Sequence, residues 1–420
     1  MFIQEDRKWM SNMAEYNKKY VDFEKVGWKN KPSKNNQILA DGVYLSYDRN
    51  KTRRNSNVLV VSPVKNKADD GFIVPNIKQT NANYFIFDHD RTIYDKTRET
   101  LENEGYEISL IDFTDPDDSD KYNPLEMIVQ IQKNKNFDPE DFKPIVSFVK
   151  TMVNKDQHSD HFIKSVERFL LFAIIYYLFE EGLLQETNLE KLKEYITMDV
   201  VDLERMIMRS SVSEEAMSKN AFKKFKVSND LNWLKMIQVG LLLDLAFIDD
   251  YVLSVCDKTT IDLTQLSQEK KVLFVITPQN RKYEKIQKLI IDQLMMMFCC
   301  DKNNSTVRKS FIVRDADMFL GNEFELLYMV MVARKVNLSI SSIIETLGPL
   351  QNCKDLSNLD ILLDTLVCMG LPYGYISNMV KQVIQPPKNE LYFDEEERCY
   401  VKVRGEYPIK TKIYKDIYKD

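Results

Sequence analysis

Two lysines that could contact an anion lie in a turn after the first buried strand. The stretch "NVLVVSPVKNKADDGFIVPNI", Asn57 to Ile77, opens with four aliphatic residues and then reaches this turn, which holds Lys65 and Lys67 but no glycine. A strand that ends in a turn and starts a helix is where a Walker A loop, G-x-x-x-x-G-K-[ST], binds phosphate through backbone N–H groups and a lysine. The position suits phosphate binding, whereas the residue types do not.

A second group with chemical potential is "DQHSDHF", in which His158 and His161 stand three apart beside Asp156 and Asp160. This spacing would suit a metal site on one face of a helix. Acidic and polar residues before an apolar helical run are also typical of a solvated helix start. We favour the helix start and predict no metal site.

A third group is the segment "SKNAFKKFKVSNDLNWLK", in which lysines alternate with Phe222 and Phe225. The lysines nearest these rings are Lys219, Lys223, Lys224 and Lys226. Lysines interleaved with aromatic rings could contact a nucleic-acid backbone and stack on bases. An amphipathic helix with solvated lysines explains the pattern equally well, and we favour it.

Several enzyme classes are poorly supported by the composition. The sequence has three histidines and contains no G-x-S-x-G elbow and no H-E-x-x-H motif. Its six cysteines show no C-x-x-C spacing, which argues against a zinc ribbon or a disulfide scaffold and fits a reducing compartment. We predict no catalytic residue of these classes.

Charge and hydropathy limit the binding partners. Lys and Arg number 58 against 64 Asp and Glu, so the formal charge of −6 gives no global basic field for nucleic acid or an anionic membrane. The longest apolar run, "FLLFAIIYYLF" at residues 169–179, is shorter than the roughly 20 residues of a membrane span. The charged N-terminus lacks the apolar core of a signal peptide. We expect no membrane span.

Strand-like segments alternate with helical ones in two parts of the chain. The strand-like segments are "GVYLSYD", "NVLVVS", "YFIFD", "EISLIDF", "KKVLFVIT", "KSFIVRD" and "LSISSII". Helices are predicted at Tyr94–Glu104, Lys282–Cys300 and Glu323–Val336. A strand, a crossover helix and a second strand predict an α/β fold with a mostly parallel sheet flanked by helices.

The region between the two α/β parts has a helical period. One predicted helix face carries Phe162, Val166, Phe169, Leu170, Ala173, Ile174 and Tyr177. A second helical stretch runs from Ala221 to about Phe247. We therefore predict an N-terminal arm at 1–37, a split α/β domain at 38–129 and 256–420, and an inserted all-α domain at 130–255.

The order of these motifs resembles a known family. The matching segments are "YLSYDRNKTRRNSNVLVV", "VPNI", "FIFD", "GYEISLIDF", "SDKYNPLEMI", "SDHFIKSVERFLLFAIIYYL", "KKVLFVITP", "VARKVNLSISSII" and "VKVRGEYPI". Together they are similar to the TraG/TraD type of type IV secretion coupling protein over roughly residues 38–410. The resemblance implies a RecA-like P-loop NTPase fold interrupted by an all-α domain. It also implies a hexameric ATPase that delivers a relaxase–DNA complex to a conjugation channel.

The resemblance also shows which residues replace the Walker A motif. Its eight positions are here Ser62, Pro63, Val64, Lys65, Asn66, Lys67, Ala68 and Asp69. Ser62 and Lys67 replace the glycines, and Ala68 replaces the phosphate-binding lysine. Asp69 replaces the hydroxyl that ligates Mg²⁺, and we expect it to add a negative charge beside a polyphosphate. At ~4 Å and an effective dielectric of ~20, two unit charges repel by roughly 4 kcal/mol.

Three further nucleotide motifs are altered in the same way. A Walker B strand ends in an Mg²⁺-binding aspartate followed by a glutamate, and "SFIVRD" places Arg314 and Asp315 there. Glu345 replaces the glutamine at the end of the later strand, and the family's D-P-K-G-E motif is reduced to Asp88 followed by "HDRT". We expect binding of ATP and Mg²⁺ to be weak or absent, with no other cofactor.

Three hypotheses follow for the function. The first is a catalytically inactive coupling-protein homologue, a pseudo-ATPase that acts as a scaffold or adaptor for relaxosome and DNA delivery. Its expected partners are an active coupling ATPase, a relaxase or other secretion proteins, within a ring oligomer, in the cytoplasm beside the membrane channel. The second is an active DNA-translocating ATPase that uses Lys65, Lys67 and Asp315. The third is a DNA-binding module of the same fold.

Overall fold

The structure, a computed structural model, describes most of the 420-residue chain. The described residues are 13–26, 28–133, 143–153, 160–261, 263–300, 307–316, 333, 336–345, 364–370 and 397–415. They divide into two compact units. The first comprises residues 1–108, 266–274 and 304–420, and the second comprises residues 109–265 and 275–303.

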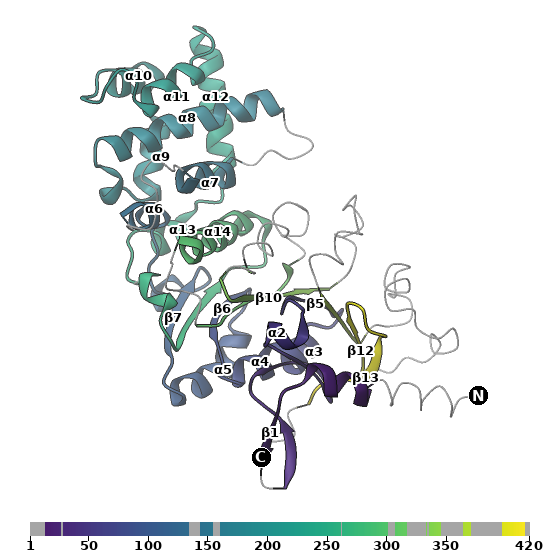
Figure 1. Ribbon diagram of the computed structural model, residues 1–420. Helices are drawn as coiled ribbons and strands as arrows, with labels where there is room; N and C mark the ends of the chain where they lie inside the picture. The colour runs from purple at the N-terminus through teal and green to yellow at the C-terminus, as the bar shows by residue number, and fades with distance from the viewer. Residues whose placement is uncertain are drawn as a thin grey trace. The chain divides into compact units, whose positions relative to one another are not determined.

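A large sheet lies among the described residues, and its nine strands stand in the order β13-β12-β11-β5-β10-β9-β6-β8-β7 (Figure 1). Their bounds are β5 (Val58–Val61), β6 (Asn83–Asp88), β7 (Glu107–Asp112), β8 (Lys271–Ile276), β9 (Lys309–Val313), β10 (Leu338–Ile344), β11 (Thr365–Met369), β12 (Arg398–Val403) and β13 (Ile409–Lys412). Strand β10 pairs in parallel with β5 and β9, β6 with β9, and β11 with β5. Strands β12 and β13 join at one edge in antiparallel pairs.

The central strands are buried along their whole length. Every residue of β5, β6, β8, β9 and β10 is buried. Such continuous burial is typical of a parallel sheet whose two faces are both covered, and it explains the uninterrupted aliphatic runs in the sequence. The mostly parallel sheet predicted from these runs is confirmed.

Helices of the first unit follow the strands of the sheet. They are α2 (Arg49–Thr52), α3 (Lys65–Ala68), the π-helix η1 (Asp69–Ile73), α4 (Val74–Lys78) and α5 (Thr92–Asn103). Helices α4 and α5 contact each other. Helix α5 confirms the helix predicted between β6 and β7.

Two small hairpins precede the large sheet. Strands β1 (Phe23–Val26) and β2 (Lys29–Pro32) form one, and β3 (Asn36–Ala40) and β4 (Val43–Ser46) form the other. The sequence analysis missed the first hairpin, because its strands are almost entirely exposed and carry no apolar alternation.

The described part of the second unit consists mainly of helices. They are α6 (Pro124–Lys133), α7 (Lys143–Met152), α8 (His161–Glu180), α9 (Leu189–Thr197), α10 (Val200–Met208), α11 (Met217–Phe225), α12 (Leu231–Asp244), α13 (Asp250–Val255) and α14 (Glu284–Cys300). Short 3₁₀ turns lie at η2 (Pro116–Asp118), η3 (Leu184–Glu186) and η5 (Arg281–Tyr283), and η4 (Leu263–Ser267) belongs to the first and second units in part.

Helix α8 is the centre of this unit and packs against α7, α9, α10, α11 and α12. Its start confirms the favoured interpretation of the histidine segment, because Asp160 caps the helix and accepts hydrogen bonds from the N–H groups of Phe162 and Ile163 at 2.8 and 3.2 Å. Of the predicted inner face, Phe162 is 59% exposed and Phe169 and Tyr177 are half-buried. The remaining four residues are buried: Val166, Leu170, Ala173 and Ile174. His158 lies outside the described residues.

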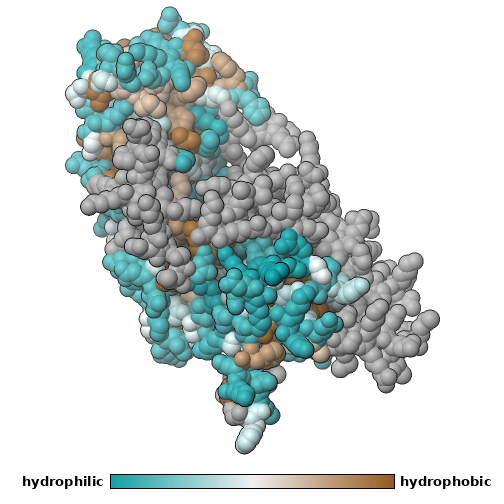
Figure 2. All heavy atoms as spheres, viewed as in Figure 1, coloured by the Kyte–Doolittle hydropathy of each residue, from teal (hydrophilic) through white to brown (hydrophobic). Residues whose placement is uncertain are grey.

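The stretch predicted as helical from Ala221 to about Phe247 contains two helices and not one. Helix α11 ends at Phe225, and α12 begins after Asp230, whose carboxylate accepts a hydrogen bond from the Asn232 N–H at 2.9 Å. An aspartate cap of this kind starts a new helix. Helix α12 is apolar on several sides, and exposed apolar side chains such as Leu243 contribute to the hydrophobic surface of this unit (Figure 2).

The predicted domain boundaries stay predictions, since the two compact units are cut within strands β7 and β8. The predicted helix Glu323–Val336 falls almost wholly outside the described residues. Among the described residues, no helix combines the length and the apolar character needed to cross a membrane.

Candidate functional site

The sheet brings the four altered nucleotide motifs to one edge. Ser62 follows β5, Asp88 ends β6, Arg314 follows β9, and Glu345 follows β10. These strands are parallel, so their carboxyl ends lie together. In open α/β sheets ligands bind at this edge. The vestigial positions predicted from the sequence therefore lie in one region of the first unit.

The turn after β5 is shorter than a phosphate-binding loop. Helix α3 begins at Lys65, so only Ser62, Pro63 and Val64 connect it to the strand. The Ser62 hydroxyl donates to the Val64 carbonyl oxygen at 2.8 Å, and the Lys67 N–H donates to the same oxygen at 3.1 Å. These bonds close the turn on itself. Residues that would surround a phosphate in a Walker A loop are here already helical.

The helix continues without a break through a π-helical segment. Ala68 and Asp69 are completely buried where α3 joins η1. Gly71 permits a close approach in η1, because a Cβ at this position would overlap the Ile413 side chain. Ala68 thus packs into the core at the position where the resemblance implies a phosphate-binding lysine.

A buried ion network occupies the space between the altered motifs. Arg314 donates from Nη2 to Asp69 Oδ2 at 2.8 Å and from Nη1 to Asp88 Oδ1 at 2.7 Å. The Nη1 atom also donates to Asp90 Oδ1 at 2.9 Å. The side chains of Arg314, Asp69 and Asp88 are 5%, 1% and 1% exposed. We call these four residues the arginine network.

Burial and charge shift the pKa values within the network. Burial raises the pKa of Asp69 to about 6, although the charge of Arg314 acts in the opposite direction. Burial also raises the pKa of Asp88, again against Arg314. Burial lowers the pKa of Arg314, but Asp88 and Asp69 outweigh this effect and raise it overall. The guanidinium is therefore permanently charged and holds the two carboxylates in place.

A second cluster contains Lys65. Its ammonium pairs with Asp315 Oδ2 at 2.8 Å and with Glu345 Oε1 at 3.2 Å. His89 Nε2 lies 3.6 Å from the same Asp315 oxygen. Burial lowers the pKa of Lys65, but its contacts with Asp315 and Glu345 together outweigh this and raise the pKa overall. Asp315 has a φ of 54°, a conformation that is uncommon outside glycine and often found at functional sites.

The structure corrects the expected effect of Asp69. The sequence predicts that its charge repels a polyphosphate, but the carboxylate is buried and paired with Arg314. The repulsion expected from Asp69 alone is therefore wrong. The ion pairs of the two clusters join five carboxylates to two cations.

The residues present do not fit a magnesium–nucleotide group. In P-loop NTPases the loop hydroxyl and the Walker B aspartate together hold Mg²⁺. Asp69 and Arg314 stand at these two positions and bond to each other. A guanidinium has no lone pair to offer, whereas Mg²⁺ requires oxygen ligands in octahedral geometry. Within the described residues, no group of three or more His, Cys, Asp or Glu side chains could hold a metal ion.

The four lysines of the candidate nucleic-acid surface are not equivalent. Lys219 is buried, and its ammonium donates to the Val212 carbonyl at 3.0 Å and pairs with Glu214 at 3.2 Å. Lys226 pairs with Glu204 at 2.7 Å. Lys224 is exposed and lies 5.4 Å above the Phe169 ring, and Lys223 is exposed. A role in nucleic-acid binding stays a prediction, carried mainly by the last two lysines.

The sequence analysis missed two members of the site. Asp90 completes the arginine network, and His89 contacts the second cluster. Both lie within the "HDRT" segment that follows Asp88. The position of Asp90 could have indicated its role, because it stands two residues after Asp88, which ends a strand, and both side chains can reach the same edge of the sheet.

Comparison with known families identifies the chain. The family model described as "Type IV secretory system Conjugative DNA transfer" matches residues 10–330. The chain belongs to this family. The resemblance seen in the motif order is confirmed. No curated protein sequence matches the chain.

Solved structures agree with this membership of the conjugative DNA transfer family at the level of the fold. The plasmid coupling protein TrwB in complex with ADP and Mg²⁺ has a TM-score of 0.66 at 12% identity, over 94% of this chain and 96% of that one. VirB4 of Thermoanaerobacter pseudethanolicus has a TM-score of 0.56 at 14% identity, over 91% and 97% of the two chains. The predicted RecA-like P-loop NTPase fold is confirmed, and the chain is a conjugative coupling-protein homologue.

Proposed function

We propose that this chain serves conjugative DNA transfer as a scaffold whose nucleotide site no longer hydrolyses ATP. Membership of the conjugative DNA transfer family supports the process. The bond between Asp69 and Arg314 supports the loss of hydrolysis, and it carries the proposal. The two positions that would share a magnesium ion have become partners of opposite charge.

The pairing of Asp69 with Arg314 at these two positions should prevent catalysis for an electrostatic reason. Phosphoryl transfer depends on positioning and on cations that neutralise the charge developing on the phosphate oxygens. Arg314 is a cation, but its Nη1 donates to Asp88 and its Nη2 donates to Asp69, so both terminal nitrogens are engaged by buried carboxylates. Its charge is therefore balanced within the protein and is not available to a phosphate.

The short turn supports the same proposal. A phosphate-binding loop offers several free backbone N–H groups to its ligand. Here Pro63 has no N–H, and the Lys67 N–H is used inside the turn. Two backbone donors that a Walker A loop could offer are therefore missing or used, so we expect the binding of ATP and Mg²⁺ to be weak or absent.

We place the scaffold beside the secretion channel, where it would join an active coupling ATPase or hold a relaxosome. The helices around α8 belong to a different segment of the chain from the vestigial site and offer a surface of their own. The exposed Lys223 and Lys224 are the candidate DNA contacts on this surface. Such a role requires binding without turnover. The fold can be kept for this purpose because burial of the sheet stabilises it without a nucleotide.

A second candidate function is an ATPase with an altered site. The contacts of Lys65 with Asp315 and Glu345 favour it, because they place a lysine at a helix start beside two acids at the ends of neighbouring strands. In this alternative, Lys65 would contact the phosphate, and Asp315 would activate water.

Titration calorimetry of a non-hydrolysable ATP analogue with Mg²⁺ tests the two candidates. The scaffold proposal expects no saturable heat from the unmodified protein up to about millimolar nucleotide. Micromolar binding that disappears in a Lys65→Met variant would overturn it and favour the ATPase. An assay of ATP turnover with DNA present then follows.

A repair variant provides the gain-of-function control. Lys67→Gly, Ala68→Lys and Asp69→Thr restore the loop residues, and Arg314→Asp accompanies them to restore the Walker B acid, because Asp69→Thr alone would remove one of the two buried carboxylates that pair with Arg314. Circular dichroism checks that the variant is folded. Nucleotide binding by the repaired protein alone would show that these four positions suppress binding in the natural chain.

A further inference from the structure

A pocket lies at the edge of the sheet opposite the vestigial nucleotide site. Lys270, Arg308 and Asn337 each stand directly before a strand, and Asn83 begins β6, so the pocket adjoins the amino ends of β6, β8, β9 and β10. All its lining residues belong to the first unit. Its volume of about 570 Å³ falls within the range of small-molecule sites.

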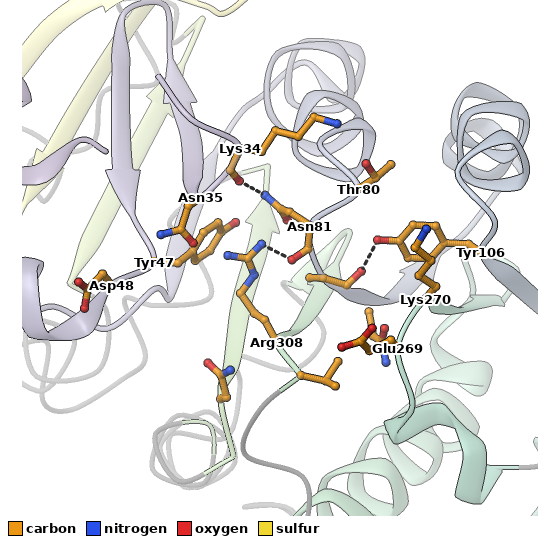
Figure 3. A pocket seen from close by; sticks show the side chains of 14 residues that line it. Lys34, Asn35, Tyr47, Asp48, Thr80, Asn81, Tyr106, Glu269, Lys270 and Arg308 are labelled. Atoms are coloured by element: carbon orange, nitrogen blue, oxygen red, sulfur yellow. Dashed lines mark hydrogen bonds between the residues drawn. The ribbon is translucent and has the colours of Figure 1, made fainter. Parts of the chain in front are cut away.

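An arginine stacked on a tyrosine lies in the middle of this pocket. The Arg308 guanidinium carbon lies 3.6 Å from the centre of the Tyr47 ring. Figure 3 shows Tyr47 on one side of Arg308, with Tyr106 and Lys270 on the other. The Nη2 group donates to the Asn81 carbonyl oxygen, and Nε is buried without a hydrogen-bond partner among the described residues. No carboxylate of the described chain forms an ion pair with Arg308, so its charge is not neutralised.

Two lysines add to the uncompensated positive charge. Lys34 lines the pocket, and its ammonium has no partner in the described part of the chain. The Lys270 ammonium donates to the Glu104 carbonyl oxygen at 2.7 Å but pairs with no acid there. The lining also holds two acids: Asp48, which accepts bonds from the first N–H groups of α2, and Glu269, which is exposed. The three cations of the lining exceed these two acids by one. The pocket therefore favours an anion.

The backbone around the pocket is held in an uncommon conformation. Thr80, Lys270 and Asn337 have φ values of 53°, 60° and 50° and account for three of the five non-glycine residues with positive φ in the described chain. Such conformations are costly, most of all for a β-branched residue such as Thr80, and they cluster at ligand sites. Asn337 also presents a side-chain amide that makes no hydrogen bond with described residues.

We propose that this pocket binds a nucleotide unit, either free or at the end of a single strand of nucleic acid. The flat stack of Arg308 on Tyr47 lies against the base, because bases stack on guanidinium planes and aromatic rings. The free amide of Asn337 pairs with the polar edge of the base. The ammonium groups of Lys34 and Lys270 contact the phosphate. This site is separate from the Walker-type site and requires neither hydrolysis nor Mg²⁺.

Calorimetric titration of the full chain with 5′-AMP tests the proposal. Adenosine and inorganic phosphate are titrated separately, because each carries only one half of 5′-AMP. A short oligodeoxythymidylate tests binding of nucleic acid. We expect 5′-AMP to bind at least about tenfold more tightly than either half-ligand, because it engages the stack and the lysines together. Tighter binding of the oligonucleotide than of 5′-AMP would assign the site to nucleic acid. The reverse order would assign it to a free nucleotide.

Three variants locate the binding. Lys34→Met removes one charge and no contact within the fold, and it should weaken 5′-AMP by about three- to tenfold. Arg308→Lys keeps the charge but removes the planar stack, so it should weaken 5′-AMP more than phosphate. Lys65→Met, at the opposite edge, should change nothing. If Arg308→Lys fails to fold, Lys34→Met still decides.

Two results would overturn the proposal. One is the absence of saturable binding by 5′-AMP and the oligonucleotide up to about 10 mM. The other is binding that Lys34→Met leaves unchanged or that Lys65→Met abolishes, since the ligand would then lie elsewhere. Because the variants separate the two edges, a failure here does not bear on the proposed scaffold role.

Discussion

Replacement of Arg314 by methionine would break the arginine network and should strongly destabilise the first unit. Asp69 and Asp88 would remain as buried carboxylates without their cation, since their side chains are each 1% exposed. Breaking a buried ion pair by removing one partner typically costs about 3–5 kcal/mol. Because each 1.4 kcal/mol is a factor of ten, the opening equilibrium should rise by roughly 10² to a few times 10³.

Hydrogen exchange of peptides from β6 and β9 measures this effect locally, so the test does not require the whole chain to unfold in a single step. Lys96→Met provides a matched control, because Lys96 pairs with Asp70 at a similar 2.8 Å but is 34% exposed, with its partner 58% exposed. Such an exposed pair is worth at most about 1 kcal/mol. Lys96→Met should therefore change exchange by less than about tenfold.

The effect should also depend on pH in a defined direction. The pKa of Asp69 is about 6 in the folded chain, above the usual value, and it should rise further without Arg314. The folded state then binds protons more tightly than the unfolded state, so acidification favours folding. The excess exchange of Arg314→Met, corrected for the intrinsic pH dependence, should shrink from pH 8 to pH 5. Exchange rates within about threefold of the natural chain at pH 8 would refute the account of the network.

Three other predictions concern separate parts of the molecule. Gly240→Ala should destabilise the helical unit by about 1–3 kcal/mol, because the added Cβ would overlap the Glu167 side chain. Thermal melting followed by circular dichroism measures this loss of stability. Adding Glu167→Ala to Gly240→Ala should restore part of it. Asp22→Asn should lower the melting temperature at pH 7 but not near pH 2. Burial raises the pKa of Asp22, yet its bonds to Lys51, Ser46 and Asn35 together outweigh this and lower the pKa. The stabilisation therefore exists above the pKa of the unfolded chain and is lost as the pH falls through the pKa of the folded chain. Lys223→Glu should weaken DNA binding in fluorescence anisotropy and reduce the salt slope by about one; an unchanged slope would remove Lys223 from the interface.

The central strands of the sheet could be predicted because each corresponds to a short, continuous run of mainly apolar residues in the sequence. Strand β10 coincides with the predicted segment "LSISSII", and β9 with most of "KSFIVRD". Strand β11 was not predicted, and its place beside β5 rests on pairing with residues about three hundred positions earlier in the chain. A pairing over such a distance depends on the assembled core, so no local pattern reveals it.

Only part of the candidate site could be predicted from the sequence, for a related reason. From the resemblance, the sequence predicted that Asp69 and Arg314 each stand where the family has a nucleotide-binding residue. It could not show that the two replacements neutralise each other, because that depends on the parallel order of β5, β9 and β6. Each of these two residues alone predicts loss of nucleotide binding, and in the folded chain their side chains bond to each other.

A counter-ion that belongs to the polypeptide differs from a bound metal in one further respect. Mg²⁺ exchanges with solvent, so the stability it gives depends on its concentration and is lost to a chelator. The Arg314 guanidinium is covalently attached and buried between its carboxylates, and neither dilution nor chelation can remove it. The stability that these ion pairs give to the carboxyl edge of the sheet therefore does not vary with the cellular supply of magnesium. A fall in free Mg²⁺ would leave this contribution unchanged.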